Sequence, residues 1–194
     1  TGCTLVLYDG SPFANEGNVL LDAIEDEGIT VFGTSARYIA GLEKQGLKPA
    51  KTHQLSSVKT ILSTGSPLSE TSYEYIYRDF KADVCLSSIS GGTDIISCFM
   101  LGNPNLPVYA GEIQCRGLGM AVEFWNQRNE SVTDATGELV CTRSFPSTPI
   151  GFWQDPEDER FLKAYFAEHP GIWTHGDYGE LTESGGIVIQ GRSD

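Results

Sequence analysis

Residues 58–67 read VKTILSTGSP, and residues 83–94 read DVCLSSISGGTD. Each stretch begins with an apolar, β-branched run, which predicts a buried strand, and ends in glycines and small hydroxyl residues. Between them, Ser69 precedes a stretch with helical spacing of its apolar residues, so a helix is expected to connect the two strands. Strands that alternate with helices indicate parallel βαβ units, and the first half of the chain is therefore predicted to be α/β.

The same alternation extends toward the N-terminus. Asn15 is a candidate cap for a helix over 16–27, and Gly28 is a candidate stop for it. We expect strands over 4–8, 29–32, 58–62 and 83–89, and helices over 16–27, 35–45 and after Ser69.

The second half has short apolar runs separated by Gly, Pro and Asp/Asn clusters, which indicates a small antiparallel barrel or sandwich. We place a boundary near residue 105, between a parallel α/β subdomain over 1–105 and a β-rich subdomain over 106–194. Asp155 and Pro156 are expected to start one helix, with Leu162 on its apolar face. The expected strands are 111–116, 119–125, 137–143, 172–174, 179–183 and 186–190.

The charge balance excludes several partners. The chain has 13 Lys+Arg against 26 Asp+Glu, a formal net charge of −13, which repels nucleic acid and anionic membranes. A nucleotide ligand stays open, because small sites bind phosphate through local dipoles and metal ions. No run of 18 apolar residues is present, so no membrane span is expected. The five cysteines form no CxxC pair and are interpreted as buried thiols of a cytoplasmic protein.

Three predicted strands end in small residues: Gly33–Ser35, Ser63–Pro67 and Ser90–Asp94. Parallel sheets bind ligands beyond the carboxyl ends of their strands, and such residues let a ligand approach the backbone closely. The alternative is that these residues only form turns. No GxSxG or HExxH motif is present, the three histidines are scattered, and the strongest candidate acids are Asp94 and Asp177.

The ordered motifs STGSP (63–67), SGGTD (90–94), THGD (174–177) and GRSD (191–194) resemble those of the adenylate-forming acyl-CoA synthetases. The resemblance covers essentially the whole chain. It implies a two-step reaction in which a carboxylate attacks the α-phosphorus of ATP, and coenzyme A then displaces AMP from the acyl-adenylate. The implied cofactors and co-substrates are ATP, Mg²⁺ and coenzyme A.

The resemblance also implies roles for single residues. Thr93 would donate to an α-phosphate oxygen, Asp94 would hold Mg²⁺, Asp177 would accept from the ribose hydroxyls, and Arg192 would assist there. The implied nucleotide contacts are completed by Gly65, Ser66 and Pro67 against adenine, and by Ser90, Gly91 and Gly92 around adenine and the acyl group.

Each role has an alternative. Thr93 could be an ordinary strand-end hydroxyl, Asp94 could cap a following helix, Asp177 could shape a turn, and Arg192 could be a surface residue. The motif ends in Thr-Asp where the family has Thr-Glu, so direct coordination of the metal by Asp94 stays open.

The residues that precede Thr93 in the sequence predict an acyl pocket. Acetyl-activating relatives carry bulky aromatic side chains there, whereas this chain has Ser90 and Gly91. Our hypothesis is that Gly91 admits an acyl group longer than acetate, which fits acetoacetate, and that Thr34 and Thr64 help to line the pocket.

Both ends of the sequence look like cuts through a longer protein. The phosphate loop and the catalytic lysine of the implied family would lie outside this segment, so the 194 residues are expected to fold without turning over substrate. The oligomeric state is left open. The competing interpretations are another acyl or aminoacyl adenylation domain, and a non-catalytic binding module with the same fold.

Overall fold

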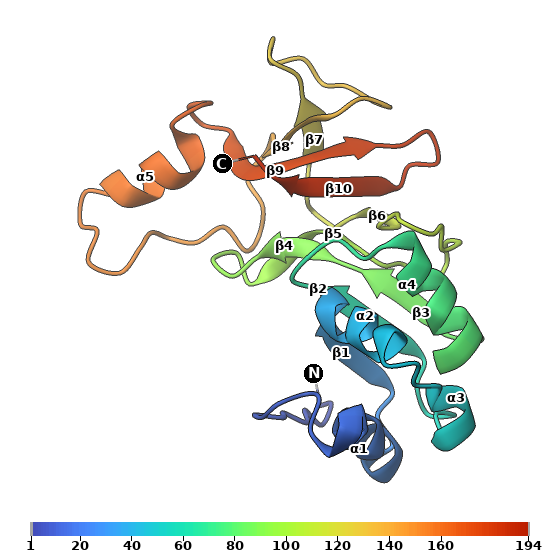
Figure 1. Ribbon diagram of the computed structural model, residues 1–194. Coiled ribbons are helices and arrows are strands. Elements are labelled where there is room, and N and C mark those ends of the chain that lie inside the picture. The colour runs from blue at the N-terminus through green and yellow to red at the C-terminus, as the bar shows by residue number, and fades with distance from the viewer. Residues whose placement is uncertain (1, 194) are drawn as a thin grey trace.

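The computed structural model describes residues 2–193 and contains three sheets (Figure 1). A parallel sheet with its helices forms one end of the molecule, a four-stranded antiparallel sheet forms the other, and a small antiparallel sheet lies between them. The predicted class, a parallel α/β part followed by antiparallel β structure, is confirmed. Asp194, the last residue of the GRSD motif, lies outside the described residues.

The three parallel strands end at one edge of their sheet. Ser35 is the register partner of Thr64, and Ser63 is the partner of Ser88, so the small residues that follow the strands are brought together. The strand order is β1-β2-β3. The strands are β1 (Val31–Ser35), β2 (Thr60–Thr64) and β3 (Cys85–Ser88).

Serine side chains cap two helices of this half, and the sequence indicated the one at Ser69. The Ser35 hydroxyl oxygen accepts from the Tyr38 N–H, and the Ser69 hydroxyl oxygen accepts from the Ser72 N–H. These bonds satisfy backbone donors that a helix start leaves without a partner. The helices are η1 (Asn15–Gly17), α1 (Val19–Glu27), α2 (Ala36–Lys44), α3 (Pro49–Thr52), α4 (Glu70–Tyr75) and the π-helical turn η2 (Ile76–Phe80).

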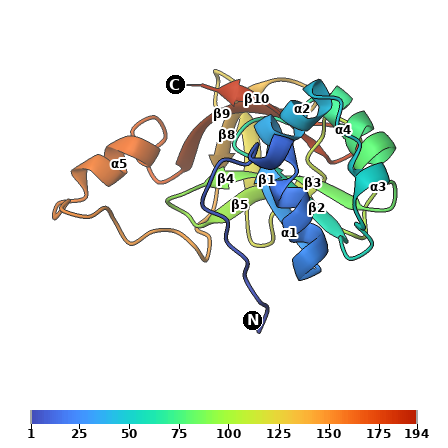
Figure 2. The ribbon, with the colours of Figure 1, turned by 60° about the horizontal axis from the view of Figure 1, so that its bottom comes forward.

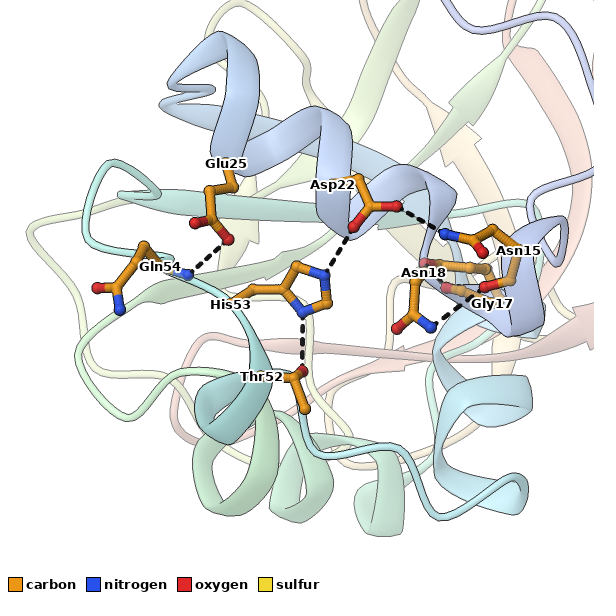
Figure 3. A network of polar contacts seen from close by, with 9 residues as sticks. Asn15, Gly17, Asn18, Asp22, Glu25, Thr52, His53 and Gln54 are labelled. Atoms are coloured by element: carbon orange, nitrogen blue, oxygen red, sulfur yellow. Dashed lines mark hydrogen bonds and ion pairs between the residues drawn. The ribbon is translucent and has the colours of Figure 1, made fainter.

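The core of the parallel half is apolar and aromatic, and α1 is attached to it by polar contacts as well. In Figure 3, His53 lies between Thr52 and Asp22, with Nε2 3.0 Å from the Asp22 carboxylate and Nδ1 2.8 Å from the Thr52 hydroxyl. The amide of Asn15 donates to the same carboxylate at 2.9 Å, and Gln54 N–H donates to Glu25 at 3.0 Å. The central core residues are Leu21, Ile24, Ile39, Leu42, Ile61, Tyr73, Ile76 and Leu86.

The predicted helix over 16–27 is wrong at its start. Asn15 has φ 51° and does not cap it; a short 3₁₀ turn precedes α1, whose first residue is Val19. Gly28 ends the helix in the left-handed conformation, as predicted.

The predicted strand over 4–8 is also wrong. Figure 2 shows the N-terminal segment extending away from the body of the molecule, and Leu5 and Leu7 are 75% and 82% exposed. An apolar run becomes a strand only where a neighbouring strand supplies hydrogen bonds, and none of the described residues does so here.

A small antiparallel sheet follows β3. The stretch over 97–101 was not predicted as a strand, while most of 111–116 is a loop with one bridge from Ile113 to Ile187. Residues on both sides of position 105 contribute to this sheet, and the division of the chain at 105 stays a prediction. Its strands are β4 (Ser90–Gly92), β5 (Ser97–Leu101) and β6 (Cys115–Arg116).

The four-stranded sheet has the order β10-β9-β8-β7. The two strands predicted over 172–174 and 179–183 are one strand, β9, whose pairing with β8 is interrupted by a register shift. The buried face of this sheet contributes Phe124, Leu139 and Ile187 to a core cluster that also contains Phe99 of β5. The strands are β7 (Val122–Trp125), β8 (Gly137–Cys141), β9 (Trp173–Leu181) and β10 (Ile187–Arg192).

Helix α5 (Glu159–Phe166) begins later than the sequence suggested. The carboxylate of Asp155 accepts hydrogen bonds from the N–H groups of Arg160 and Phe161 at 3.2 and 3.0 Å. Although Asp155 precedes the helix, its side chain thus satisfies two backbone donors of the first turn. Leu162, expected on the apolar face, is exposed. No helix among residues 2–193 is long and apolar enough to cross a membrane.

Candidate functional site

A cleft of about 690 Å³ opens where the carboxyl ends of β2 and β3 face β9 and β10. This size suits a small-molecule ligand. All residues that were assigned a role in binding or catalysis line it except Thr34 and Asp94, and of the strand-end residues Gly33, Ser35 and Ser63 do not. The lining residues are Thr64, Gly65, Ser66, Pro67, Ser88, Ile89, Ser90, Gly91, Gly92, Thr93, Ile96, Ser97, Cys98, Ile113, His175, Asp177, Ile189, Gly191 and Arg192.

The parallel strands supply one wall of the cleft. The turn after β2 begins at Thr64, and Gly65 in it has φ +85°, a conformation that side-chain-bearing residues rarely adopt. The end of β3 supplies Ser88 beside it. Thr34, at the end of β1, pairs with Ser63 and does not reach the cleft, so its role in an acyl pocket stays a prediction without a contact there.

Strand β4 forms the adjoining wall, and the backbone packing explains its glycines. A Cβ at Gly91 would lie 2.1 Å from the Ser97 carbonyl oxygen, and one at Gly92 would lie 2.9 Å from Cε1 of His175. Gly91 is therefore required by the close approach of β5, whatever ligand is bound. Its predicted part in admitting a longer acyl group stays a prediction.

The loop after β4 places Thr93 in the cleft and Asp94 just outside its lining. The alternative that Asp94 caps a helix is wrong, because residues 93–96 form a turn, closed by the Ile96 N–H to Thr93 C=O bond at 3.2 Å, and lead into β5. The carboxylate of Asp94 accepts a hydrogen bond from the hydroxyl of Tyr165 in α5. Sequence spacing gave no sign of this contact between residues 71 positions apart.

Asp177 reaches the cleft because β9 is irregular at this point. Gly176, with φ +82°, donates its N–H to Glu138 at 2.9 Å and accepts from the Ser193 N–H at 2.9 Å. The pairing of β9 with β8 is irregular across residues 175–177, and the pairing of β9 with β10 shifts beside Tyr178. Such bulges change the direction of side chains at functional sites. Asp177 is consequently buried and directed into the cleft.

Arg192 pairs with this carboxylate. Its Nη1 donates to Asp177 Oδ1 at 3.2 Å and to the His175 carbonyl oxygen at 3.3 Å. Arg192 is thus part of the cleft, and the alternative that Asp177 only shapes a turn is wrong, because Asp177 lies within β9 and has a charged partner.

His175 is a cleft residue that sequence reasoning missed. It was considered only as one of three scattered histidines, although it stands two positions before Asp177 in the THGD motif. It is 9% exposed, and its Nε2 lies 3.8 Å from Asp177 Oδ2. Burial lowers the pKa of the imidazole, and the Asp177 carboxylate opposes that shift.

The residues present are compatible with a nucleotide and its magnesium ion. Among residues 2–193 no group of three or more His, Cys, Asp or Glu side chains could hold a metal. Mg²⁺ in nucleotide sites is commonly held by one or two carboxylates together with substrate phosphates, so one carboxylate beside the cleft suffices. Asp94 meets this requirement, since the Tyr165 hydroxyl donates to Oδ2, one of the two oxygens of its carboxylate.

A cleft at the carboxyl ends of parallel strands, completed by an antiparallel unit that brings an acid and an arginine, is the arrangement of an α/β ligand-binding domain. The chain belongs to the AMP-binding enzyme family, whose sequence profile matches residues 1–145.

Within this family, the chain is similar to acetoacetyl-CoA synthetases. The chain is 55% identical over 193 residues to the acetoacetyl-coenzyme A synthetase of Rhizobium meliloti (strain 1021), a match that covers 100% of this chain and 30% of that protein. The structure of acetoacetyl-CoA synthetase from Streptomyces lividans matches with a TM-score of 0.89 and 43% identity over 96% of this chain and 29% of that one. The predicted resemblance to the acyl-CoA synthetases is confirmed.

A more distant structure shares the fold. The anthranilate CoA ligase AuaEII, solved in complex with anthranoyl-AMP, matches with a TM-score of 0.82 at 18% identity over 100% of this chain and 35% of that one. The chain spans about 30% of the length of the curated relatives it matches.

Proposed function

We propose that this chain is part of an ATP-dependent acid–CoA ligase that activates acetoacetate as an acyl-adenylate and transfers the acyl group to coenzyme A. One observation carries the proposal: residues from the turn after β2, from β4 and Thr93, and from β9–β10 line a single cleft. The names of the similar proteins support the reaction and the acid.

In the proposed reaction, a carboxylate oxygen of the acid forms a bond to the α-phosphorus of ATP, and the bond from that phosphorus to the bridging oxygen breaks. Pyrophosphate leaves with the electron pair. The sulfur of coenzyme A then attacks the acyl carbon, and AMP leaves as the thioester forms. The charge that develops on the α-phosphate oxygens is best stabilised by donors fixed in advance.

The chain's own residues would provide those donors and hold the nucleotide. Thr93 would donate its hydroxyl to an α-phosphate oxygen, and Gly65, Ser66 and Pro67 would lie against adenine. Ser90 to Gly92 would form the wall between adenine and the acyl group. Each of these residues lines the cleft.

Asp177 would accept hydrogen bonds from the ribose hydroxyls, with Arg192 holding its carboxylate in place. A buried carboxylate is suited to this role, because charge-assisted hydrogen bonds contribute roughly 1.5–3 kcal/mol each. Asp94 would hold Mg²⁺, which when bound neutralises charge on the phosphate oxygens.

The acyl pocket would include Thr64 and the backbone of Gly91, both of which line the cleft. Thr34 would support the pocket indirectly, because it pairs with Ser63, the neighbour of Thr64. The expectation that all five thiols are buried is wrong for Cys3, which is exposed. The other four thiols, which are buried or half-buried, support a cytoplasmic location: Cys85, Cys98, Cys115 and Cys141. We expect the 194 residues alone to be inactive.

The test is acid-dependent exchange of pyrophosphate into ATP by the complete polypeptide that contains this chain, with acetoacetate, acetate, longer acids and amino acids compared. Acetoacetate is expected to give the highest rate, and Asp177→Ala is expected to reduce the rate by at least tenfold, the effect of losing about one charge-assisted bond. Exchange with an amino acid instead would point to an aminoacyl adenylation domain. If the polypeptide catalyses no exchange and millimolar ATP–Mg²⁺ does not raise its melting temperature, the proposal is overturned. The remaining interpretation would then be a non-catalytic binding module.

A further inference from the structure

The imidazole of His175 lies between the β4 backbone and Asp177. It borders both the 690 Å³ cleft and a second cleft of about 990 Å³ between α5 and the four-stranded sheet. Its Nε2 is 3.3 Å from the Gly91 carbonyl oxygen on one side and 3.8 Å from Asp177 Oδ2 on the other. His175 therefore contacts two cleft elements that are separated by more than 80 positions in the sequence.

The neighbours of the ring fix which nitrogen carries the proton. The indole N–H of Trp173 points at Nδ1 of His175 across 3.4 Å. An indole nitrogen can only donate, so Nδ1 must be the acceptor and the proton of the neutral ring resides on Nε2. The Nε2–H then donates to the Gly91 carbonyl oxygen.

Packing holds the ring in this place. Phe99 of β5 meets it edge to face, with ring centroids 4.8 Å apart. On the β4 side, Cε1 of the imidazole is so close to Gly92 that a Cβ added there would lie only 2.9 Å from it. The ring consequently fills the space between β4, β5 and β9, and a side chain larger than that of glycine does not fit at position 92.

We propose that His175 is a positioning residue: its neutral, Nε2-protonated imidazole sets the separation between the Gly91–Gly92 backbone and Asp177. This inference rests on the proposed function, in which that separation is the distance between the wall around adenine and the acyl group, and the carboxylate that holds the ribose. A ring without the Nε2 donor would fill the same volume but would leave the Gly91 carbonyl oxygen without its partner.

The experiment compares His175→Phe with His175→Gln in the complete polypeptide. Phe keeps an aromatic ring and loses the donor, whereas Gln presents an amide N–H near the former position of Nε2. We expect Phe to raise the KM for ATP about three- to tenfold, the equivalent of one lost hydrogen bond, with kcat changed less, and Gln to restore it. Equal KM values for wild type and Phe would overturn the proposal, as would equal impairment of Phe and Gln.

Two readouts do not depend on activity. Nitrogen-15 NMR of the wild-type imidazole should show a neutral ring protonated at Nε2; protonation at Nδ1 would contradict the proposal. Amide hydrogen exchange at residues 90–92 should be faster in the Phe variant than in the Gln variant. If the wild type catalyses no adenylation, the proposed function fails, yet these two measurements still decide whether His175 positions β4. His175→Asn, whose amide is too short to reach Gly91, should behave like Phe and serves if Phe does not fold.

Discussion

The hydroxyl of Tyr165 in α5 donates a hydrogen bond to the carboxylate of Asp94, in the loop that follows β4. The ring of Tyr165 also stacks on Trp173, with centroids 3.7 Å apart and an interplanar angle of 16°. Trp173 in turn donates to His175. One tyrosine thus connects α5, the proposed metal-binding acid and the strand that carries the proposed ribose acid. Burial raises the pKa of the Tyr165 hydroxyl, which keeps it a donor at neutral pH.

Tyr165→Phe is therefore expected to loosen the loop while keeping the stacking on Trp173. The variant should lose about 1 kcal/mol of unfolding free energy, measured by urea denaturation, because one hydrogen bond to a half-exposed carboxylate is removed. Amide exchange at residues 93–96 should accelerate. Tyr178→Phe is the control, since that side chain is 43% exposed. Equal stability and equal exchange in the two variants would show that the Tyr165 contact is not maintained in solution.

Gly91→Ala tests whether the backbone packing dictates glycine in β4. A Cβ there would lie 2.1 Å from a carbonyl oxygen of β5 and 2.7 Å from the Cys98 Cα, neither of which can move without displacing the strand. We expect a loss of about 1–3 kcal/mol or more in urea denaturation. Gly33→Ala in β1 is the matched control, because a Cβ at Gly33 meets nothing within 4 Å and should change stability by about 0.5 kcal/mol or less.

This outcome would also bear on substrate choice. If Gly91→Ala unfolds β4, then a bulky residue at position 91 cannot report on acyl-group size, and the pocket is better tested at Thr64, whose side chain borders the cleft.

The sequence was most informative about the parallel half. Its strand ends could be predicted to converge, because a parallel sheet places all carboxyl ends at one edge. The register itself, with Ser35 opposite Thr64 and Ser63 opposite Ser88, is known only from the structure. The cap at Ser69 could be predicted because it depends on a bond within a few residues, and the cap at Ser35 is of the same local kind although it was not predicted.

Contacts between distant segments could not be predicted. The TLVLY run over 4–8 has strand composition, but forming a strand depends on a partner that no local pattern reveals. His175 was overlooked because its importance comes from Gly91, Phe99 and Trp173, of which only Trp173 is near it in sequence. The irregularity at Gly176 that directs Asp177 inward likewise arises from β8 and β10 together.

Leu139→Ala tests the core on which β9 rests. Leu139 is 0% exposed and belongs to the cluster beneath the four-stranded sheet. Truncation should cost about 2–5 kcal/mol of unfolding free energy, through lost transfer energy and the cavity left behind. Leu118→Ala is the control, because it removes the same atoms from a side chain that is 97% exposed. Its free energy of unfolding should differ from that of the wild type by about 0.5 kcal/mol or less. If the two variants were equally stable, the sheet would not have the packing described.

Glu138 supports the proposed site from the opposite side of β9, where its Oε1 accepts the Gly176 N–H at 2.9 Å. Burial raises the pKa of this carboxyl, and the hydrogen bonds from Ser193 and Gly176 offset that effect in part. A carboxyl whose pKa is higher in the folded state binds its proton more tightly when folded. Its contribution to stability is therefore complete below the unfolded pKa of about 4.3 and is lost as the pH rises through the folded value.

Glu138→Gln should abolish that pH dependence, because the amide keeps an oxygen for the Gly176 N–H and cannot ionise. The free energy of unfolding of the variant, relative to wild type, should increase between pH 4 and pH 7.5, as measured by urea denaturation at each pH. Glu183→Gln, at an exposed position, is the control and should show no such change. A relative stability of Glu138→Gln that falls with rising pH would mean that ionised Glu138 is stabilised in the folded state, with the bonds to Gly176 and Ser193 outweighing the effect of burial. A constant value would mean that these bonds and burial balance, and it would equally contradict the raised pKa.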